Sequence, residues 1–312
     1  MTPSASPRAK ASAAPRSKTS AAPYVSVVLP VHNEAQCLED EIIRIRDGLD
    51  ASPYTWEMVL VDDASTDDSP AIADKYPWIR RITFPTNRGS GAARRVGSAA
   101  AIGDVVVWTD ADMTYPNHEI ADLVAALGDA DQVVGARESE KGTMRLLRAP
   151  TKWAIKKFAS VLTKTDIPDL NTGFRAFRRE AALPYLPLLP NGFSHVTTIT
   201  LTMLMDGKHV VFTPITYASR TGRSKFHPIR DTYVYILQVL RMVTFFSPLT
   251  VFMPVGLSLL ALGGLKLIFD IVDHPLRVAI NTMVLLFAGF QIVVLALLAD
   301  LVVSRTRHGS DT

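Results

Sequence analysis

Apolar residues in the first half of the chain occur in short runs, separated by longer stretches of mixed polarity. Short runs bounded by polar or turn residues are typical of buried parallel strands, and five of them stand at 25–31, 56–61, 81–84, 104–109 and 131–135. Between them the sequence favours helices over about 33–49, 67–76, 90–102 and 116–127. This alternation predicts an α/β domain whose mostly parallel sheet carries helices on both faces.

Two longer apolar stretches follow in the second half, at 245–265 and 278–299, and neither contains a charged side chain. Each is long enough to cross a bilayer as a helix, and the connector between them is short, so we expect a membrane hairpin. A buried hairpin inside a soluble core is the alternative. Directly before the hairpin, residues 228–244 place apolar side chains along one side of a helix, which predicts an amphipathic helix in the membrane interface.

Charge separates the N-terminal segment from the rest of the chain. The net charge is +3, and residues 1–23 contain four basic residues and no acid. This Ala/Ser/Pro-rich segment is predicted to be disordered, and it lacks the apolar core of a signal peptide. The predicted organisation is a tail, an α/β domain, an interfacial helix, two membrane helices and a C-terminal tail, at 1–23, 24–227, 228–244, 245–303 and 304–312. No nucleic-acid partner is expected.

Basic residues on both sides of the hairpin predict its orientation. They are Arg220, Arg223, Lys225, Arg230 and Arg241 before it, and Arg305, Arg307 and His308 after it. By the positive-inside tendency, both termini and the α/β domain face the cytoplasm at the plasma membrane. Cys37 is the only cysteine, so no internal disulfide can form, which fits a reducing compartment.

Two carboxylate pairs follow predicted strands. Asp110 and Asp112 flank one alanine after the run at 104–109, and Asp62 and Asp63 end the run at 56–61. In an extended segment alternate side chains point the same way, so Asp110 and Asp112 can reach one divalent cation, which prefers oxygen ligands. Such a cation can neutralise a diphosphate leaving group. Since ligands bind at the carboxyl ends of parallel strands, a common site is expected, with a solvated turn as the alternative.

Several motifs together resemble family 2 glycosyltransferases, in particular the dolichol-phosphate mannose synthase and polyprenyl-phosphate glycosyltransferase group. They are Val-Val-Leu-Pro-Val-His-Asn-Glu at 27–34, Val-Asp-Asp-Ala-Ser-Thr-Asp at 61–67, Asn-Arg-Gly at 87–89, Thr-Asp-Ala-Asp at 109–112, Asp-Leu-Asn-Thr-Gly-Phe-Arg at 169–175 and Gly-Arg-Ser-Lys at 222–225. The resemblance implies a GT-A fold, Mg²⁺ or Mn²⁺ as cofactor, and transfer of one sugar to a polyprenyl phosphate. Many members carry a C-terminal pair of membrane helices. Association with further copies of the chain is left open.

The resemblance also implies roles for residues around the donor. Pro30, His32 and Glu34 would line the nucleotide pocket, and either Asp62 or Asp63 would contact the base or ribose. The metal would be held by Asp110 and Asp112. Where mannose synthases often have Gln, two residues after the second metal aspartate, this chain has Thr114, so the identity of the donor does not carry over.

Residues around the transferred sugar are implied in the same way. Arg137 would meet phosphate, and Arg220 and Lys225 would clamp the diphosphate or the acceptor phosphate. Asp169 would lie beside the reacting sugar. Arg220 lies so close to Gly222 that its register against the family's arginine is unsettled.

The chemistry of the reaction leads to similar residues without the family. A nucleoside diphosphate that leaves a sugar develops charge, which a cation and basic side chains must stabilise, and Arg88, Arg137 and Lys225 are candidates. A polyprenyl phosphate is already an anion and needs little help from a base, so Asp169 would orient substrates more than remove a proton. A turn residue after Pro168 is the alternative for Asp169. Direct in-line attack implies inversion at the sugar carbon.

Three other functions compete with this interpretation. Residues 89–94 look like a dinucleotide-binding loop, but Arg94 stands where the third glycine is required, which argues against a dehydrogenase. A processive polysaccharide synthase would carry Gln-x-x-Arg-Trp, whereas residues 238–242 end in Met242. A membrane-tethered sensor or assembly partner that binds nucleotide sugars is the non-enzymatic alternative. The donor sugar, its nucleotide and the polyprenol length stay open.

Overall fold

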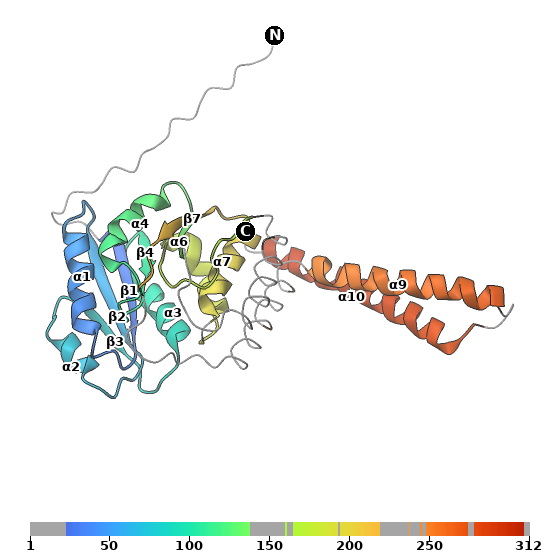
Figure 1. Cartoon of the computed structure of the whole chain (residues 1–312), viewed down its shortest axis with the longest axis horizontal. Coiled ribbons are helices and arrows are strands. Elements are labelled where there is room, and N and C mark those ends of the chain that lie inside the picture. Colours follow the sequence, from blue (N-terminus) through green and yellow to red (C-terminus); the bar gives the residue numbers. More distant parts are fainter. Residues whose placement is uncertain are drawn as a thin grey trace, which may run out of the picture.

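A computed structural model of the protein describes residues 23–137, 160, 165–192, 194–218, 237, 244, 248–273 and 278–308, with side chains up to 303. Nearly all of the predicted N-terminal tail and interfacial helix lies outside these residues. So do Arg220 and Lys225 of the predicted site. In Figure 1, an α/β domain carries two long C-terminal helices that project from one side.

The sheet has seven strands in the order β3-β2-β1-β4-β6-β5-β7. Their bounds are β1 Val25–Val31, β2 Trp56–Asp62, β3 Arg80–Thr83, β4 Val105–Trp108, β5 Gln132–Arg137, β6 Arg175–Arg178 and β7 Val210–Ile215. The five predicted strands are all present and pair in parallel where they are neighbours, and β7 pairs in parallel with β5. The pattern did not predict β7 or β6, which is inserted antiparallel between β4 and β5.

Helices cover both faces of the sheet, as the alternation predicted (Figure 1). One face packs against α1 and α4, and the other against α3 and α7. The helices are α1 Leu38–Asp50, α2 Ser69–Asp74, α3 Ser90–Ala100, α4 Ile120–Leu127, α6 Arg179–Ala182 and α7 His195–Met205, with 3₁₀ turns η1 Asn117–Glu119 and η2 Leu183–Leu188. Strand β1 is buried on both sides, because Val27 and Leu29 enter one apolar cluster and Val28 enters the other.

The predicted start of the first helix is wrong. Helix α1 begins at Leu38, with Cys37 before it, and not near residue 33. Asn33 instead has a positive φ of 56°, and its Oδ1 accepts a hydrogen bond from the backbone N of Thr66 at 2.7 Å. Residues 33–37 therefore form a loop that is tied to the loop after β2.

The C-terminal helices α9 Pro248–Asp273 and α10 Ile280–His308 are long and apolar enough to cross a membrane. Their apolar windows have mean hydropathies of 2.0 and 2.5, and only 11% and 17% of these windows are buried. A buried core hairpin would hide such side chains, so the exposed apolar surface favours lipid as its surroundings. Helix α9 continues eight residues past the end of the uncharged stretch at 265, and Lys266 and Asp270 in this extension form an ion pair of 2.9 Å along the helix.

Small residues bring α9 and α10 together. A Cβ atom on Gly263 would lie 2.9 Å from the Leu286 side chain, and one on Gly256 would lie 2.7 Å from the Val293 side chain. On α10, a Cβ on Gly289 would lie 2.9 Å from the backbone N of Leu260. The backbones of the two helices therefore approach more closely than larger residues would permit, which is typical of helix packing in membranes.

Candidate active site at the carboxyl ends of the strands

A cavity of about 320 Å³ opens where β1, β2 and β4 end. Six of the predicted site residues line it together: Pro30, His32, Glu34, Asp63, Asp110 and Asp112. The first residues of α3 and α7 complete its wall. Both members of the Asp110–Asp112 pair and one member of the other pair, Asp63, thus reach one site, whereas Asp62 is not in the lining.

The two aspartates at the end of β2 have different surroundings. Asp62 is buried, and its Oδ1 accepts a hydrogen bond from the backbone N of Ser65 at 2.9 Å, so it holds the turn. Asp63 faces the cavity and accepts from the backbone N atoms of Arg88 at 2.6 Å and Gly89 at 2.8 Å. Of the two, Asp63 is therefore the one placed to meet a ligand in the cavity.

The loop before α3 is shaped by Gly89 and fixed by Asp63. Gly89 has a φ of +90°, and a Cβ there would lie 2.5 Å from the carbonyl oxygen of Asn191, so a side chain would not fit. The guanidinium of Arg88 lies over the Phe84 ring, 4.9 Å from its centroid. Arg88 thus contributes its backbone to the Asp63 contact and does not itself line the cavity.

Residues with left-handed backbone follow three strands at the site. They are Asn33 after β1, Ala64 after β2 and Met113 after β4, with φ between 56° and 63°. This conformation costs a residue with a side chain free energy, and such residues gather at functional sites where the surrounding structure enforces them. His32 supports the first of these turns, since its Nδ1 lies 2.7 Å from the carbonyl oxygen of Asp63.

The Asp110–Asp112 segment can hold a divalent cation. Both carboxylates face the cavity, and Asp112 Oδ1 accepts a hydrogen bond from the Thr114 hydroxyl at 2.5 Å. Within the described part of the chain, no cluster of three or more His, Cys, Asp or Glu side chains is suited to a metal. Two carboxylates plus oxygens from a substrate diphosphate and water are the ligand set that Mg²⁺ ordinarily takes, so these residues fit such an ion.

A network of buried hydrogen bonds holds the Asp110–Asp112 segment in place. The Nδ2 of Asn117 donates to Glu41 Oε2 at 2.6 Å and to the carbonyl oxygen of Asp110 at 3.1 Å, and the Thr109 hydroxyl donates to Asn117. Burial raises the pKa of Glu41, although hydrogen bonding to Asn117 and the charge of Arg44 oppose the shift. Sequence reasoning missed Glu41 and Asn117, because an acidic residue inside a helix looks like part of a solvated face.

Arg94 forms a second support for the Asp110–Asp112 segment, and sequence reasoning did not predict this role either. Its Nη2 lies 2.6 Å from Asp110 Oδ1, and its Nη1 lies 2.5 Å from Nε2 of His195. Burial and the charge of Arg94 hold the pKa of His195 well below its ordinary value, so the imidazole is neutral. The only signal for Arg94 in the sequence is its position in a glycine-rich segment, which resembles a dinucleotide-binding loop.

Arg137 and Asp169 are brought together as a partly buried ion pair. The guanidinium donates from Nε to Oδ2 at 2.6 Å and from Nη2 to Oδ1 at 3.0 Å. Burial raises the pKa of Asp169, but hydrogen bonding to Arg137 and its charge outweigh this effect, and the pKa is lowered overall. Asp169 is thus a carboxylate held in place by Arg137.

The loop between Asp169 and β6 packs against the carboxylate segment. The backbone N of Gly173 donates to the Tyr115 hydroxyl at 2.7 Å, and Tyr115 stacks on Phe174. Arg175 is completely buried and donates to the carbonyl oxygen of Val196 at 2.6 Å and the Thr200 hydroxyl at 2.7 Å. These contacts join β6 and α7, two elements that the sequence pattern did not connect.

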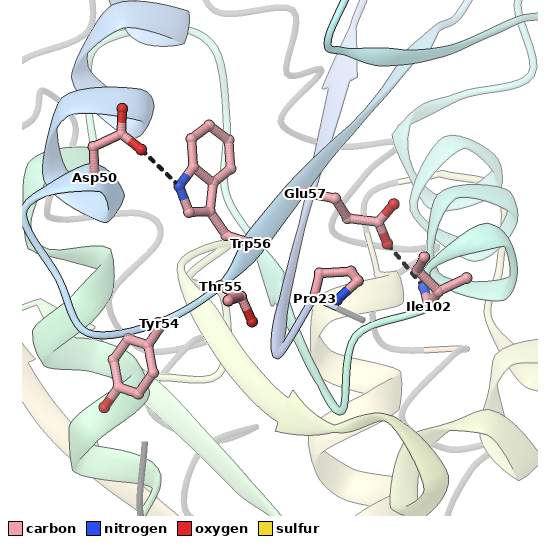
Figure 2. Close-up of a pocket in the computed structure, with 7 residues that line it drawn as sticks. All are labelled: Pro23, Asp50, Tyr54, Thr55, Trp56, Glu57 and Ile102. Atoms are coloured by element: carbon pink, nitrogen blue, oxygen red, sulfur yellow. Dashed lines mark hydrogen bonds between the residues drawn. The ribbon is translucent and has the colours of Figure 1, made fainter. Parts of the chain in front are cut away.

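A second cavity, of about 420 Å³, lies at the opposite end of the sheet (Figure 2). Its two carboxylates are engaged with the protein: Asp50 accepts from the Trp56 indole at 3.0 Å, and Glu57 accepts from the backbone N of Ile102 at 2.8 Å. It lies at the amino ends of the strands, where α/β folds do not ordinarily bind ligands. The smaller cavity is therefore the candidate active site.

Two parts of the chain match known protein families. Residues 26–185 match glycosyl transferase family 2, and residues 247–304 match the GtrB C-terminal hairpin. An undecaprenyl-phosphate 4-deoxy-4-formamido-L-arabinose transferase from Pseudomonas savastanoi pv. phaseolicola is 30% identical over 257 residues, which are 78% of this chain and 72% of the relative. The transferase of the same name from Salmonella choleraesuis is 29% identical over 252 residues, 78% and 74% of the two chains.

Among solved structures, glucosyl-3-phosphoglycerate synthase from Mycobacterium tuberculosis, in complex with Mn²⁺, UDP and glucosyl-3-phosphoglycerate, aligns with a TM-score of 0.55. The alignment covers 70% of this chain and 80% of that one at 21% identity. At this identity the likeness concerns the fold alone, and it confirms the predicted GT-A architecture.

Proposed function

The chain belongs to glycosyl transferase family 2, and from this premise we propose that it transfers one sugar from a nucleotide sugar to a polyprenyl phosphate. The observation that carries the proposal is the position of the α9–α10 hairpin beside the candidate active site. Val251 of α9 packs in one apolar cluster with Ile167, Leu170 and Leu201. Leu170 directly follows Asp169, so a helix that could cross the membrane touches the loop of the proposed transfer site.

The charges around the cavity support a requirement for a divalent cation. Its described lining contains four carboxylates, those of Glu34, Asp63, Asp110 and Asp112, and one guanidinium, that of Arg94. A diphosphate would be repelled by this lining unless a cation came with it. We propose that Asp110 and Asp112 hold Mg²⁺ or Mn²⁺. When bound, the ion would neutralise charge that develops on the leaving diphosphate.

The remaining residues divide between donor and acceptor. Pro30, His32 and Asp63 lie at the ends of β1 and β2, where the nucleotide of the donor would bind. The Arg137–Asp169 pair orients the reacting groups, and its lowered pKa keeps Asp169 ionised at neutral pH. Lys225 and Arg220 stay proposed clamps for phosphate groups, whereas Arg88 would have to turn its guanidinium away from the Phe84 ring to act as one.

The reaction then needs no strong base in the protein. A phosphate oxygen of the acceptor, already an anion, attacks the anomeric carbon of the sugar. A new carbon–oxygen bond forms as the bond from that carbon to the diphosphate oxygen breaks, with inversion. The hydrogen-bonded carboxylates of the site hold the reacting groups in position, and a cation held by Asp110 and Asp112 would supply positive charge to the leaving diphosphate.

The arrangement in the membrane completes the proposal. We propose that the domain over 24–227 and both termini face the cytoplasm, with the hairpin over 245–303 in the bilayer and the segment 228–244 in its interface. Cysteines placed in the two terminal tails, in a protein whose Cys37 is replaced, would resist an impermeant thiol reagent in intact cells. Labelling of either tail would contradict this orientation.

The deciding experiment is a donor screen with purified protein in detergent and a short polyprenyl phosphate. UDP- and GDP-linked sugars, including UDP-linked 4-deoxy-4-formamido-L-arabinose, would be offered, and the lipid product would be identified by mass. We expect a product heavier than the acceptor by one sugar. A growing polysaccharide would indicate a processive enzyme, and a polyprenol accepted as well as its phosphate would contradict the proposed attack.

A further inference from the structure

Arg94 occupies an unusual place for a cation. It lies in α3 with 3% of its side chain exposed, directly beside the carboxylate pair that we propose as the metal site. Its Nη2 contacts Asp110 Oδ1 at 2.6 Å and the carbonyl oxygen of Thr109 at 3.1 Å. One oxygen of a proposed metal ligand is therefore already bound by a permanent positive charge.

His195 fixes the other end of this guanidinium. Its Nδ1 lies 2.7 Å from the carbonyl oxygen of Gly192 and must donate to it, which leaves Nε2 as the acceptor for Arg94 Nη1. Trp108 covers the guanidinium, 5.5 Å from the ring centroid. Held at both ends and on one face, Arg94 cannot turn away from Asp110.

Gly173 closes the site on the other side. A Cβ atom there would lie 2.8 Å from Arg94 Nη2 and 2.9 Å from Asp110 Oδ2. The backbone of Gly173 is itself fixed by its hydrogen bond to the Tyr115 hydroxyl. Asp110 thus lies between α3 and the 169–175 loop, with one oxygen on Arg94 and 35% of its side chain exposed toward the cavity.

We propose that Arg94 is a positioning residue that leaves one oxygen of Asp110 for the catalytic cation and, by its charge, keeps that cation weakly bound until the donor diphosphate arrives. The proposal rests on the proposed function. A guanidinium on the same carboxylate as a divalent cation repels it, and the negative diphosphate relieves that repulsion. Cation and nucleotide would then bind cooperatively, each strengthening the other by the same factor.

The test is direct Mn²⁺ binding to the purified full-length protein in detergent, followed by the electron paramagnetic resonance of free Mn²⁺, with and without saturating UDP or GDP. We expect the wild-type protein to bind Mn²⁺ at least about tenfold more tightly with one of these nucleotides. Arg94→Gln removes the charge and keeps a polar side chain. It should bind Mn²⁺ alone about tenfold more tightly and lose most of the nucleotide effect.

Arg95→Gln is the matched control, since it removes the same charge from the next residue of α3. Arg95 donates to the carbonyl oxygen of Leu189 at 2.8 Å and to Asn191 Oδ1 at 2.9 Å, outside the cavity lining. We expect wild-type Mn²⁺ binding in this variant. If Arg94→Gln also binds Mn²⁺ as the wild type does, or more weakly in the absence of nucleotide, the proposal is overturned.

Arg94→Lys covers the case in which Arg94→Gln does not fold. Lysine keeps the charge but cannot bridge Asp110 and His195, so Mn²⁺ binding without nucleotide should stay weak while kcat falls about tenfold. A wild-type kcat in this variant would overturn the positioning role. Wild-type protein that binds Mn²⁺ neither alone nor with either nucleotide would instead contradict the proposed function itself, and the role of Arg94 with it.

Discussion

At the scale of single residues, the site consists of carboxylates whose neighbours decide what each can do. Asp62 holds a turn, and Asp63 holds the loop before α3. Asp110 is paired with Arg94, and Asp169 with Arg137. Adjacent or similar aspartates therefore have separate roles, because each is hydrogen-bonded to a different group.

The carboxylate pair on the β4 loop leads to the first prediction. Asp112→Asn keeps the size of the side chain and removes the charge that a divalent cation requires, so kcat should fall by about 100-fold or more. Turnover would be measured with purified protein, with and without EDTA. Asp129→Asn, at an exposed position away from the cavity, should have wild-type activity. Full activity of the wild type in excess EDTA would contradict metal dependence.

The Arg137–Asp169 pair predicts a pH-dependent stability. Asp169→Asn removes the carboxylate that pairs with a partly buried guanidinium, so it should destabilise the protein by about 2 kcal/mol at pH 7. The folded-state pKa of Asp169 is lowered, so its ionisation stabilises the fold above the ordinary value of 3.8, and this contribution is lost as pH falls through the folded-state pKa.

Thermal unfolding of both proteins across this pH range would check the sign. The difference between their Tm values should be largest near neutral pH and should shrink below about pH 4. A difference that stays constant, or grows in acid, would show that the Asp169 charge does not contribute in this way.

At the scale of elements, the strand ends and the hairpin follow different rules. Loops after β1, β2 and β4 depend on left-handed residues and on hydrogen bonds between loops. The α9–α10 pair depends on close approach of two backbones at Gly256, Gly263 and Gly289. Hydrogen bonds between loops hold the site, whereas the hairpin combines close backbone approach with a hydrogen bond from the Thr282 hydroxyl to Asp270 Oδ2 at 2.5 Å.

Gly263 and Gly264 allow this rule to be tested on neighbouring residues. A side chain at Gly263 would press on Leu286, whereas one at Gly264 would meet nothing within 4 Å. Gly263→Leu should destabilise the hairpin by about 1–3 kcal/mol, and Gly264→Leu should have little effect. Thermal stability in detergent would be compared for the two variants. Equal losses would mean that the glycines do not set the helix contact.

At the scale of the whole molecule, the hairpin does more than attach the domain to a membrane. Val251, in the first turn of α9, belongs to the small apolar cluster that also contains Leu170. Because Leu170 follows Asp169, a movement of α9 would also displace the Arg137–Asp169 pair. The membrane helices and the proposed transfer site are thus connected by packing.

Val251→Ser should therefore lower kcat about threefold or more, because losing the apolar contact loosens the loop that carries Asp169. Val255→Ser, one turn further along α9 at an exposed position, is the control. Both would be assayed in detergent with the same short-chain acceptor, so that membrane attachment plays no part. Equal kcat values for the two variants would show that α9 acts only as an anchor.

The sequence by itself determined the structural features that depend on residues close together along the chain. Strands β1 to β5 follow from short apolar runs bounded by polar residues, and the two long C-terminal helices follow from the length of their uncharged stretches, because both signals are local. The carboxylate pairs were found for the same reason, because their members stand one or two residues apart after strands.

Tertiary structure alone decided the contacts between distant segments. Strand β6 contains two arginines in four residues, and only the place between β4 and β5 makes it a strand. Arg94 and His195 stand 101 residues apart, and Arg137 and Asp169 stand 32 apart. Buried charges look like surface residues in a sequence, because their cost is offset only by partners that folding brings to them.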